Sequence, residues 1–119
     1  MNAQQYKKKT YNYNYNNNNS KIRLISNYIY SFLENDFNID INNRAIDNYN
    51  GKLMYQFNKY IISEYLEQFH NNKSKICDFL ISKLNKFMNN YNHYVVDCNI
   101  VQTKHMINFW NIEIHLSQR

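Results

Sequence analysis

The chain has 119 residues, enough for one domain, and a folded part of about 75 residues buries only about 60% of its unfolded surface, so dimerisation would help it. Its formal net charge is +5, but the only basic run is Lys7, Lys8 and Lys9, which favours a mixed-charge surface over a nucleic-acid patch. Two cysteines are too few for a secreted disulfide framework, and no segment approaches the ~20 apolar residues of a membrane span. We therefore expect a soluble cytoplasmic protein with reduced thiols.

The first 43 residues divide into a polar tail and a helical extension. Residues 1–20 end in alternating tyrosine and asparagine followed by an asparagine run, a low-complexity composition that predicts disorder. From Lys21 apolar residues recur at helical spacing, with Ser20 as a candidate N-cap, which predicts an amphipathic helix over 21–35. Residues 38–43 then suggest an irregular connector, in which Ile39 and Ile41 alternate as in a short strand.

Two further helices are predicted in the middle of the chain. Over 53–69 an apolar stripe runs through Phe57, Tyr60, Ile61, Tyr65 and Phe69. After a short break a second helix over 74–87 keeps the same periodicity. Because the break is short, we expect the two helices to pack side by side and antiparallel.

Beyond Asn92 the apolar period changes from that of a helix to that of a strand. Residues 94–101 alternate, with Tyr94, Val96, Cys98 and Ile100 expected on one face. Residues 106–110 and 112–116 continue the alternation. The sequence thus predicts an α+β fold: two antiparallel helices on a small antiparallel β-sheet, preceded by a disordered tail and an extra N-terminal helix.

The residue types that carry chemistry do not form a recognisable constellation. Zinc ligands come in closely spaced pairs, and neither C-x-x-C nor H-x-x-x-H occurs among Cys77, Cys98 and the four histidines. Each cysteine falls on the expected core side of its element, where a thiol behaves as a small hydrophobe. The single glycine, Gly51, cannot make a phosphate-binding loop. We therefore expect no catalytic residue, no metal and no cofactor.

Several segments resemble the eight-kilodalton dynein light chains. Residues 103–110 are similar to the T-K-H-F-I-Y-F-Y stretch of that family, and 65–69 to the A-L-E-K-Y that ends its first helix. Residues 84–93 are similar to its F-D-K…N…W-H segment, and 45–48 sit where the family has its first strand, V-I-K-N. The resemblance thus covers residues 44–119, which we take as the light-chain-like domain, after a tail over 1–20 and an extension over 21–43.

The resemblance implies a function as well as a fold. Family members are dimers with a strand exchanged between subunits, and they bind linear peptides by adding a strand beside it. His93 matches the family's interface histidine, so it and Val95 are implied at a dimer interface. The implied peptide groove contains Asn99, Ile100, Asn108 and Trp110, although fewer residues separate His93 from Thr103 than in the family.

We therefore expect a non-catalytic dynein light chain. It would be an accessory subunit of a cytoskeletal microtubule motor that binds the dynein intermediate chain or other linear peptides as a homodimer. The Tctex-type light chains are a second resemblance, because 94–102 and 109–111 are similar to their Y-I-V-T-C-x-I-x-Q and F-W-D stretches. An alternative from another class is a small basic nucleic-acid-associated protein, based on the net charge and the tyrosine-rich tail.

Overall fold

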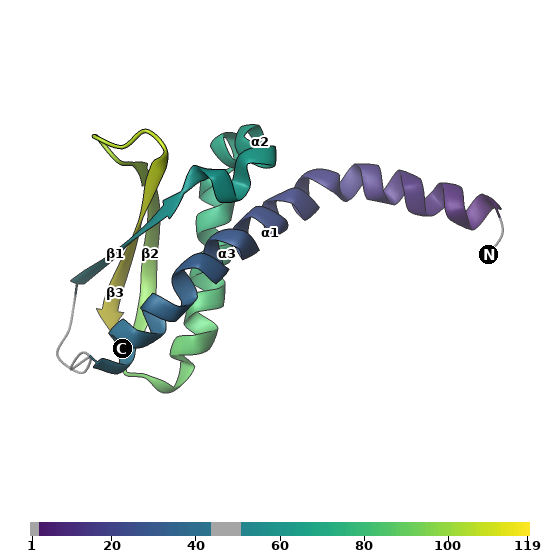
Figure 1. Ribbon diagram of the computed structural model, residues 1–119. Helices are drawn as coiled ribbons and strands as arrows, with labels where there is room; N and C mark the ends of the chain where they lie inside the picture. The colour runs from purple at the N-terminus through teal and green to yellow at the C-terminus, as the bar shows by residue number, and fades with distance from the viewer. Residues whose placement is uncertain (1–2, 44–50) are drawn as a thin grey trace.

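The protein has an α+β fold, as the sequence predicts. The computed structural model describes the backbone of residues 3–43 and 51–119 and the side chains of 19–43 and 51–119. In this part of the chain the sheet has three antiparallel strands in the order β1-β3-β2, and no helix combines the length and apolarity that crossing a bilayer requires (Figure 1). The elements are α1 (Ala3–Asn43), β1 (Gly51–Asn58), η2 (Lys59–Tyr65), α2 (Leu66–Asn71), α3 (Lys73–Phe87), η3 (Met88–Asn90), β2 (His93–Gln102) and β3 (Phe109–Gln118).

The first helix is longer than predicted at both ends. The backbone is already helical from Ala3, where the sequence predicts a disordered tail, and it stays helical through the predicted connector to Asn43. Phe37 and Ile41 explain the C-terminal extension, because both are buried and continue the stripe on one side of the helix. A helix anchored in this way extends at low cost through a segment without proline or glycine.

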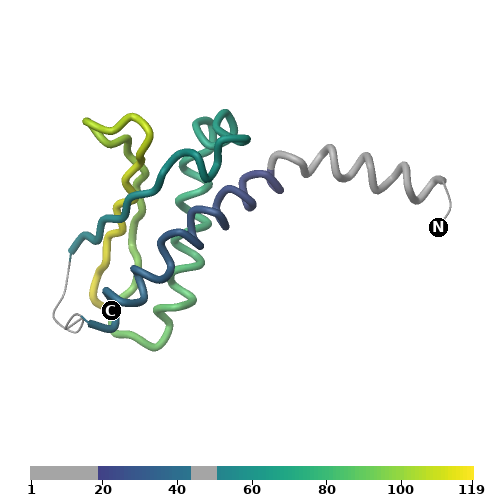
Figure 2. The backbone as a smooth tube through the Cα atoms, viewed as in Figure 1, coloured from purple at the N-terminus to yellow at the C-terminus, as the bar shows by residue number. Residues whose placement is uncertain are grey.

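Residues 21–43 belong to the core of the folded unit and do not form a separate extension. Figure 2 shows this part of α1 lying along the rest of the chain. The inner side of the helix is buried over the residues whose side chains are described, and Ile39 lies on the other, exposed side. Its buried residues are Ile22, Ile25, Ser26, Ile29, Leu33, Phe37 and Ile41.

The predicted helix over 53–69 is wrong in its first third. Gly51–Asn58 is the strand β1, in which Leu53, Tyr55 and Phe57 are buried while the residues between them are exposed. The side chain of Asn58 then accepts a hydrogen bond from the Tyr60 N–H at 3.0 Å, which starts the 3-10 helix η2. Helical structure therefore begins only after Asn58. The implied family strand at 45–48 lies outside the described residues.

The helical neighbour of α3 is α1, and the two run in the same direction. Near the start of the contact Lys83 Nζ donates to Asn27 Oδ1 at 2.7 Å. Further along, the rings of Phe37 and Phe87 meet edge to face with their centroids 5.9 Å apart. The order of these contacts is the same in both helices, so the predicted antiparallel pair of 53–69 and 74–87 is replaced by a parallel pair of α1 and α3.

Because of a β-bulge in β2, the residues that point into the core in its first half are the ones expected to point outward. The register with β3 shifts between Val95 and Asp97, so both Val96 and Asp97 are exposed. Val95, Cys98 and Ile100 are the residues that point into the core, whereas Val96 was expected there. In β3 the expected inward set of Ile112, Ile114 and Leu116 is confirmed, but the strand begins at Phe109 and not at Met106.

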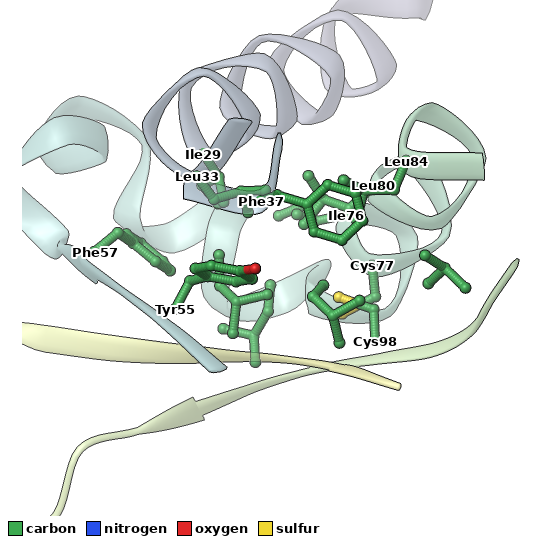
Figure 3. Packing of buried hydrophobic residues seen from close by; sticks show 14 of the residues in the cluster. Ile29, Leu33, Phe37, Tyr55, Phe57, Ile76, Cys77, Leu80, Leu84 and Cys98 are labelled. Atoms are coloured by element: carbon green, nitrogen blue, oxygen red, sulfur yellow. The ribbon is translucent and has the colours of Figure 1, made fainter. Parts of the chain in front are cut away.

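The hydrophobic core lies between the sheet and the two long helices, which cover the same face of the sheet (Figures 1 and 3). Phe37 packs edge to face on Tyr55, with ring centroids 6.3 Å apart, and the Tyr55 hydroxyl donates to Asp40 at 2.8 Å. From α3 the buried Ile76, Leu80 and Leu84 enter the same core. No helix of residues 3–43 or 51–119 covers the opposite face of the sheet.

We predict that Leu84→Ala lowers the free energy of unfolding by about 2–5 kcal/mol, because Leu84 is 0% exposed and truncation leaves a cavity. Leu24→Ala is the matched control, since this leucine lies on the exposed side of α1 and should cost much less. Urea unfolding of both variants at low protein concentration measures the difference. Equal midpoints for the two would contradict the described core.

Candidate protein-interaction surface

The two residues implied at a dimer interface are buried inside the single chain. His93 and Val95 are both in the core at the start of β2, and the described groups offer no hydrogen-bond partner to either imidazole nitrogen of His93. Neither side chain has surface to offer to a second copy in this structure. Their role at a dimer interface stays a prediction. A contact there would have to be made by exposed residues beside them.

The four residues implied in a peptide groove do not line one groove. Asn99 is exposed on the open face of the sheet, whereas Ile100 and Trp110 are buried on the opposite face. The carbonyl of Asn108, in the loop before β3, accepts from the Lys59 N–H at 2.8 Å. The Trp110 ring packs edge to face on Phe69 at 5.1 Å, so it closes one end of the core.

Side chains of α3 already occupy part of the free edge of β2. The Asn85 amide donates to the Val95 carbonyl at 2.9 Å and accepts from the Val95 N–H at 2.7 Å, as a neighbouring strand would. Asp97 Oδ1 accepts from the N–H of the next residue at 2.9 Å. The Ile100 N–H lies close enough to the Cys77 thiol on α3 to lower the pKa of that thiol. An added strand would have to displace these contacts between Val95 and Ile100.

The open face of the sheet is mainly polar. On it Lys52 and Glu113 form an ion pair at 3.5 Å, and the strand register places Asn99 and Met54 on either side of Glu113. Isolated apolar residues such as Met54 are normal on such a surface. This face resembles an ordinary solvated surface more than the apolar face of a sheet that packs on another sheet.

Helix α1 carries a second apolar stripe on its exposed side. Leu24, Tyr28 and Phe32 follow each other at intervals of four residues, Ile39 comes seven residues later, and each is 36–49% exposed. Residues at these spacings lie on one face of a helix. We call these four residues the outer stripe. The sequence prediction had placed Tyr28 and Phe32 with the inner side of the helix, so it missed this surface.

The apolar surface continues from the outer stripe onto η2. Tyr28 lines a hollow of about 210 Å³ together with residues 60–65 of η2, among them the polar Ser63 and Glu64. Tyr60 is 62% exposed and therefore extends the apolar surface beyond α1. Contiguous exposed apolar residues of this kind are typical of protein–protein contacts.

Opposite charges flank the outer stripe. Lys21 lies three residues before Leu24, and Asp36 lies four residues after Phe32, so both share the side of the helix that the stripe occupies. Asp36 is exposed, and Lys21 is partly exposed. The surface is thus an apolar strip with a positive N-terminal end and a negative C-terminal end.

Potential metal ligands do not gather at one place in the described part of the chain. Within residues 19–43 and 51–119 no three side chains of His, Cys, Asp or Glu lie close enough together to hold a metal ion.

Comparison with protein-family models, curated proteins and solved structures finds no match to this chain. The outer stripe offers a second molecule a continuous row of exposed apolar side chains.

We predict that Asn85→Ala destabilises the protein by about 1–3 kcal/mol, because it leaves the Val95 N–H and carbonyl without their partner. The Val95 amide should also exchange its hydrogen faster, which distinguishes loss of the edge contact from a general effect. Asn89→Ala, at an exposed position of η3, is the control and should change neither property. Unchanged exchange at Val95 in the Asn85 variant would refute the proposed covering of the edge.

Proposed function

We propose that this protein is a non-catalytic adaptor of the dynein light chain type, and that it acts as a homodimer joined through the outer stripe of α1. The observation that carries the dimer is the row of half-exposed apolar side chains on a helix whose other side is already buried. Full burial of a side chain such as Phe or Leu stabilises by about 1.5–3 kcal/mol. Each half-exposed residue thus leaves a substantial part of that energy available for association.

A second copy fits this surface because its charges are complementary in an antiparallel pair. If two α1 helices cross at Tyr28, Leu24 of one lies opposite Phe32 of the other. Lys21 then lies opposite Asn35 of the second copy, one residue from Asp36 and within reach of it, and the two-fold symmetry repeats the contact. A parallel pair would place like charges together. The stripe has four residues, fewer than the roughly 20–30 residues per partner of stable complexes, so we expect a micromolar dimer.

The light-chain part of the proposal is supported by the sequence resemblance at 103–110. In the structure this run forms the loop between β2 and β3 and the first residues of β3. Met106 and Ile107 are exposed there, Ile107 to 70%, and Val101 is exposed at the end of β2 nearby. Since α3 covers the edge of β2 up to Ile100, we place a bound peptide at this end of the sheet.

The proposed adaptor has a location in the cell and a partner there. It would be a cytoplasmic, cytoskeleton-associated subunit whose partner is the dynein intermediate chain, with other linear peptides as further partners. Dimerisation through α1 leaves the β2–β3 loop of each copy open. Two peptide strands could then be held by one adaptor, which raises their effective affinity through bivalency.

Phe32→Glu should convert the dimer to a monomer, because a carboxylate would be desolvated in the centre of the contact. Sedimentation velocity between about 1 and 100 μM measures this, a range chosen around the affinity expected for a small interface. Met54→Glu on the open face of the sheet is the matched control and should leave association unchanged. A wild-type protein that stays monomeric over this range would contradict the proposal.

The direction of pairing is tested by exchanging charges. Lys21→Glu and Asp36→Lys should each weaken the dimer roughly threefold to tenfold, because exposed ion pairs are worth about 0.2–1 kcal/mol each and the symmetric contact holds two. The double variant should recover the lost affinity. Additive weakening in the double variant would refute the antiparallel arrangement while leaving the stripe as an interface.

The partner is tested with immobilised recombinant dynein intermediate chain. We expect the wild-type protein to bind and Ile107→Glu to lose binding, because the charge falls in the most exposed apolar residue of the proposed peptide site. Met54→Glu again serves as the control. If the Ile107 variant still bound the intermediate chain, the peptide site would have to lie elsewhere on the protein. If the wild-type protein did not bind, the light-chain assignment would be wrong.

A further inference from the structure

Cys77 and Cys98 contact each other across the interface of α3 and β2. Both are free and buried, and their side chains point toward one another (Figure 3). The Cys98 thiol is close enough to be the largest influence on the pKa of the Cys77 thiol. Two thiols brought together from separate elements are an arrangement that oxidation can convert to a covalent link.

A groove gives small molecules access to the pair. Although Cys77 is 8% and Cys98 only 4% exposed, both line a surface hollow of about 320 Å³. Lys73 and Ser74 at the start of α3 border the same hollow, as do Asp78 and Asp97. The hollow is large enough to admit hydrogen peroxide, which is little bigger than water.

The two thiols differ in acidity. The hydrogen bond from Cys98 lowers the pKa of the Cys77 thiol, and the Ile100 N–H acts in the same direction, against burial and the nearby charges of Asp78 and Asp97. The pKa of Cys98 is raised, first because it is the partner that keeps its proton in this hydrogen bond and then by burial. Cys77 is also the more exposed thiol of the pair, so we take it as the one that reacts first.

We propose that Cys77 and Cys98 form a reversible disulfide in response to hydrogen peroxide, with Cys77 as the reacting thiol and Cys98 as the resolving one. The Cys77 thiolate attacks a peroxide oxygen, the O–O bond breaks, and the products are a sulfenic acid and hydroxide. The Cys98 sulfur then attacks the Cys77 sulfur, the S–O bond breaks, and the hydroxyl leaves as water. In total two thiols and one peroxide give one disulfide and two waters.

The disulfide would bind α3 to the edge of β2 that it already covers. Asn85 holds the same strand edge at Val95, two helical turns further along α3. The oxidised protein should therefore show slower hydrogen exchange at Val95 and Ile100 and a higher melting temperature than the reduced protein. This inference rests on the contact of the two thiols and does not depend on the proposed adaptor function.

The full chain, reduced and freed of reductant, is treated with hydrogen peroxide and analysed by intact mass and by peptide mapping. We expect the loss of two hydrogen atoms and a peptide that joins Cys77 to Cys98, both reversed by dithiothreitol. Two free thiols after treatment, or a disulfide only between different chains, would overturn the proposal. This measurement needs no variant, so it does not depend on whether a substitution folds.

Two variants test the order of the steps. Cys98→Ser should react at the wild-type rate and accumulate a sulfenic acid at Cys77 that dimedone traps, since the resolving thiol is absent. Cys77→Ser should react at least about tenfold more slowly, because the remaining thiol is the more basic and the more buried. Equal peroxide reactivity of the two variants would overturn the assigned roles.

Discussion

The packing of Phe37 joins the separate parts of this fold. Its ring meets Tyr55 of β1 on one side and Phe87 of α3 on the other, both edge to face. The hydrogen bond from the Tyr55 hydroxyl to Asp40, one turn further along α1, fixes the helix over the strand. One face of the three-stranded sheet is buried, and α1 and α3 together cover it. Without α1 the inner faces of β1 and α3 would be exposed.

This arrangement also determines which surfaces remain for partners. A helix that turns one side to the core normally presents polar residues on the other, yet α1 presents the outer stripe of Leu24, Tyr28, Phe32 and Ile39. The open face of the sheet, by contrast, carries the ion pair of Lys52 and Glu113. The exposed apolar residues of α1 form one continuous row, and this is why we assign self-association to α1 and not to sheet packing.

The sequence predicts elements well where one periodicity dominates. Ile76, Leu80 and Leu84 on α3 and Ile112, Ile114 and Leu116 on β3 follow one period each, and all are buried as expected. Over 53–69 the sequence satisfies two periods, because Phe57 belongs equally to an alternating series with Leu53 and to a helical series with Ile61. The segment forms a strand because it pairs with β3, which lies more than fifty residues further along the chain. No local sequence pattern reveals this pairing.

The candidate sites were harder to predict than the fold for a related reason. The bulge between Val95 and Asp97 exchanges inward and outward positions, and it depends on backbone contacts that the residue pattern does not show.

The same contacts explain how β2 can be an edge strand without a strand beside it. Asn85 satisfies both backbone groups of Val95, and the thiol of Cys77 lies beside the Ile100 N–H, so α3 takes the place of part of a fourth strand. A polar residue and a cysteine on a helix that otherwise follows a simple apolar pattern are thus the residues that protect the sheet from unwanted pairing. Because Cys77 also contacts Cys98, the protection of this edge and the chemistry of the thiols are linked through one helix.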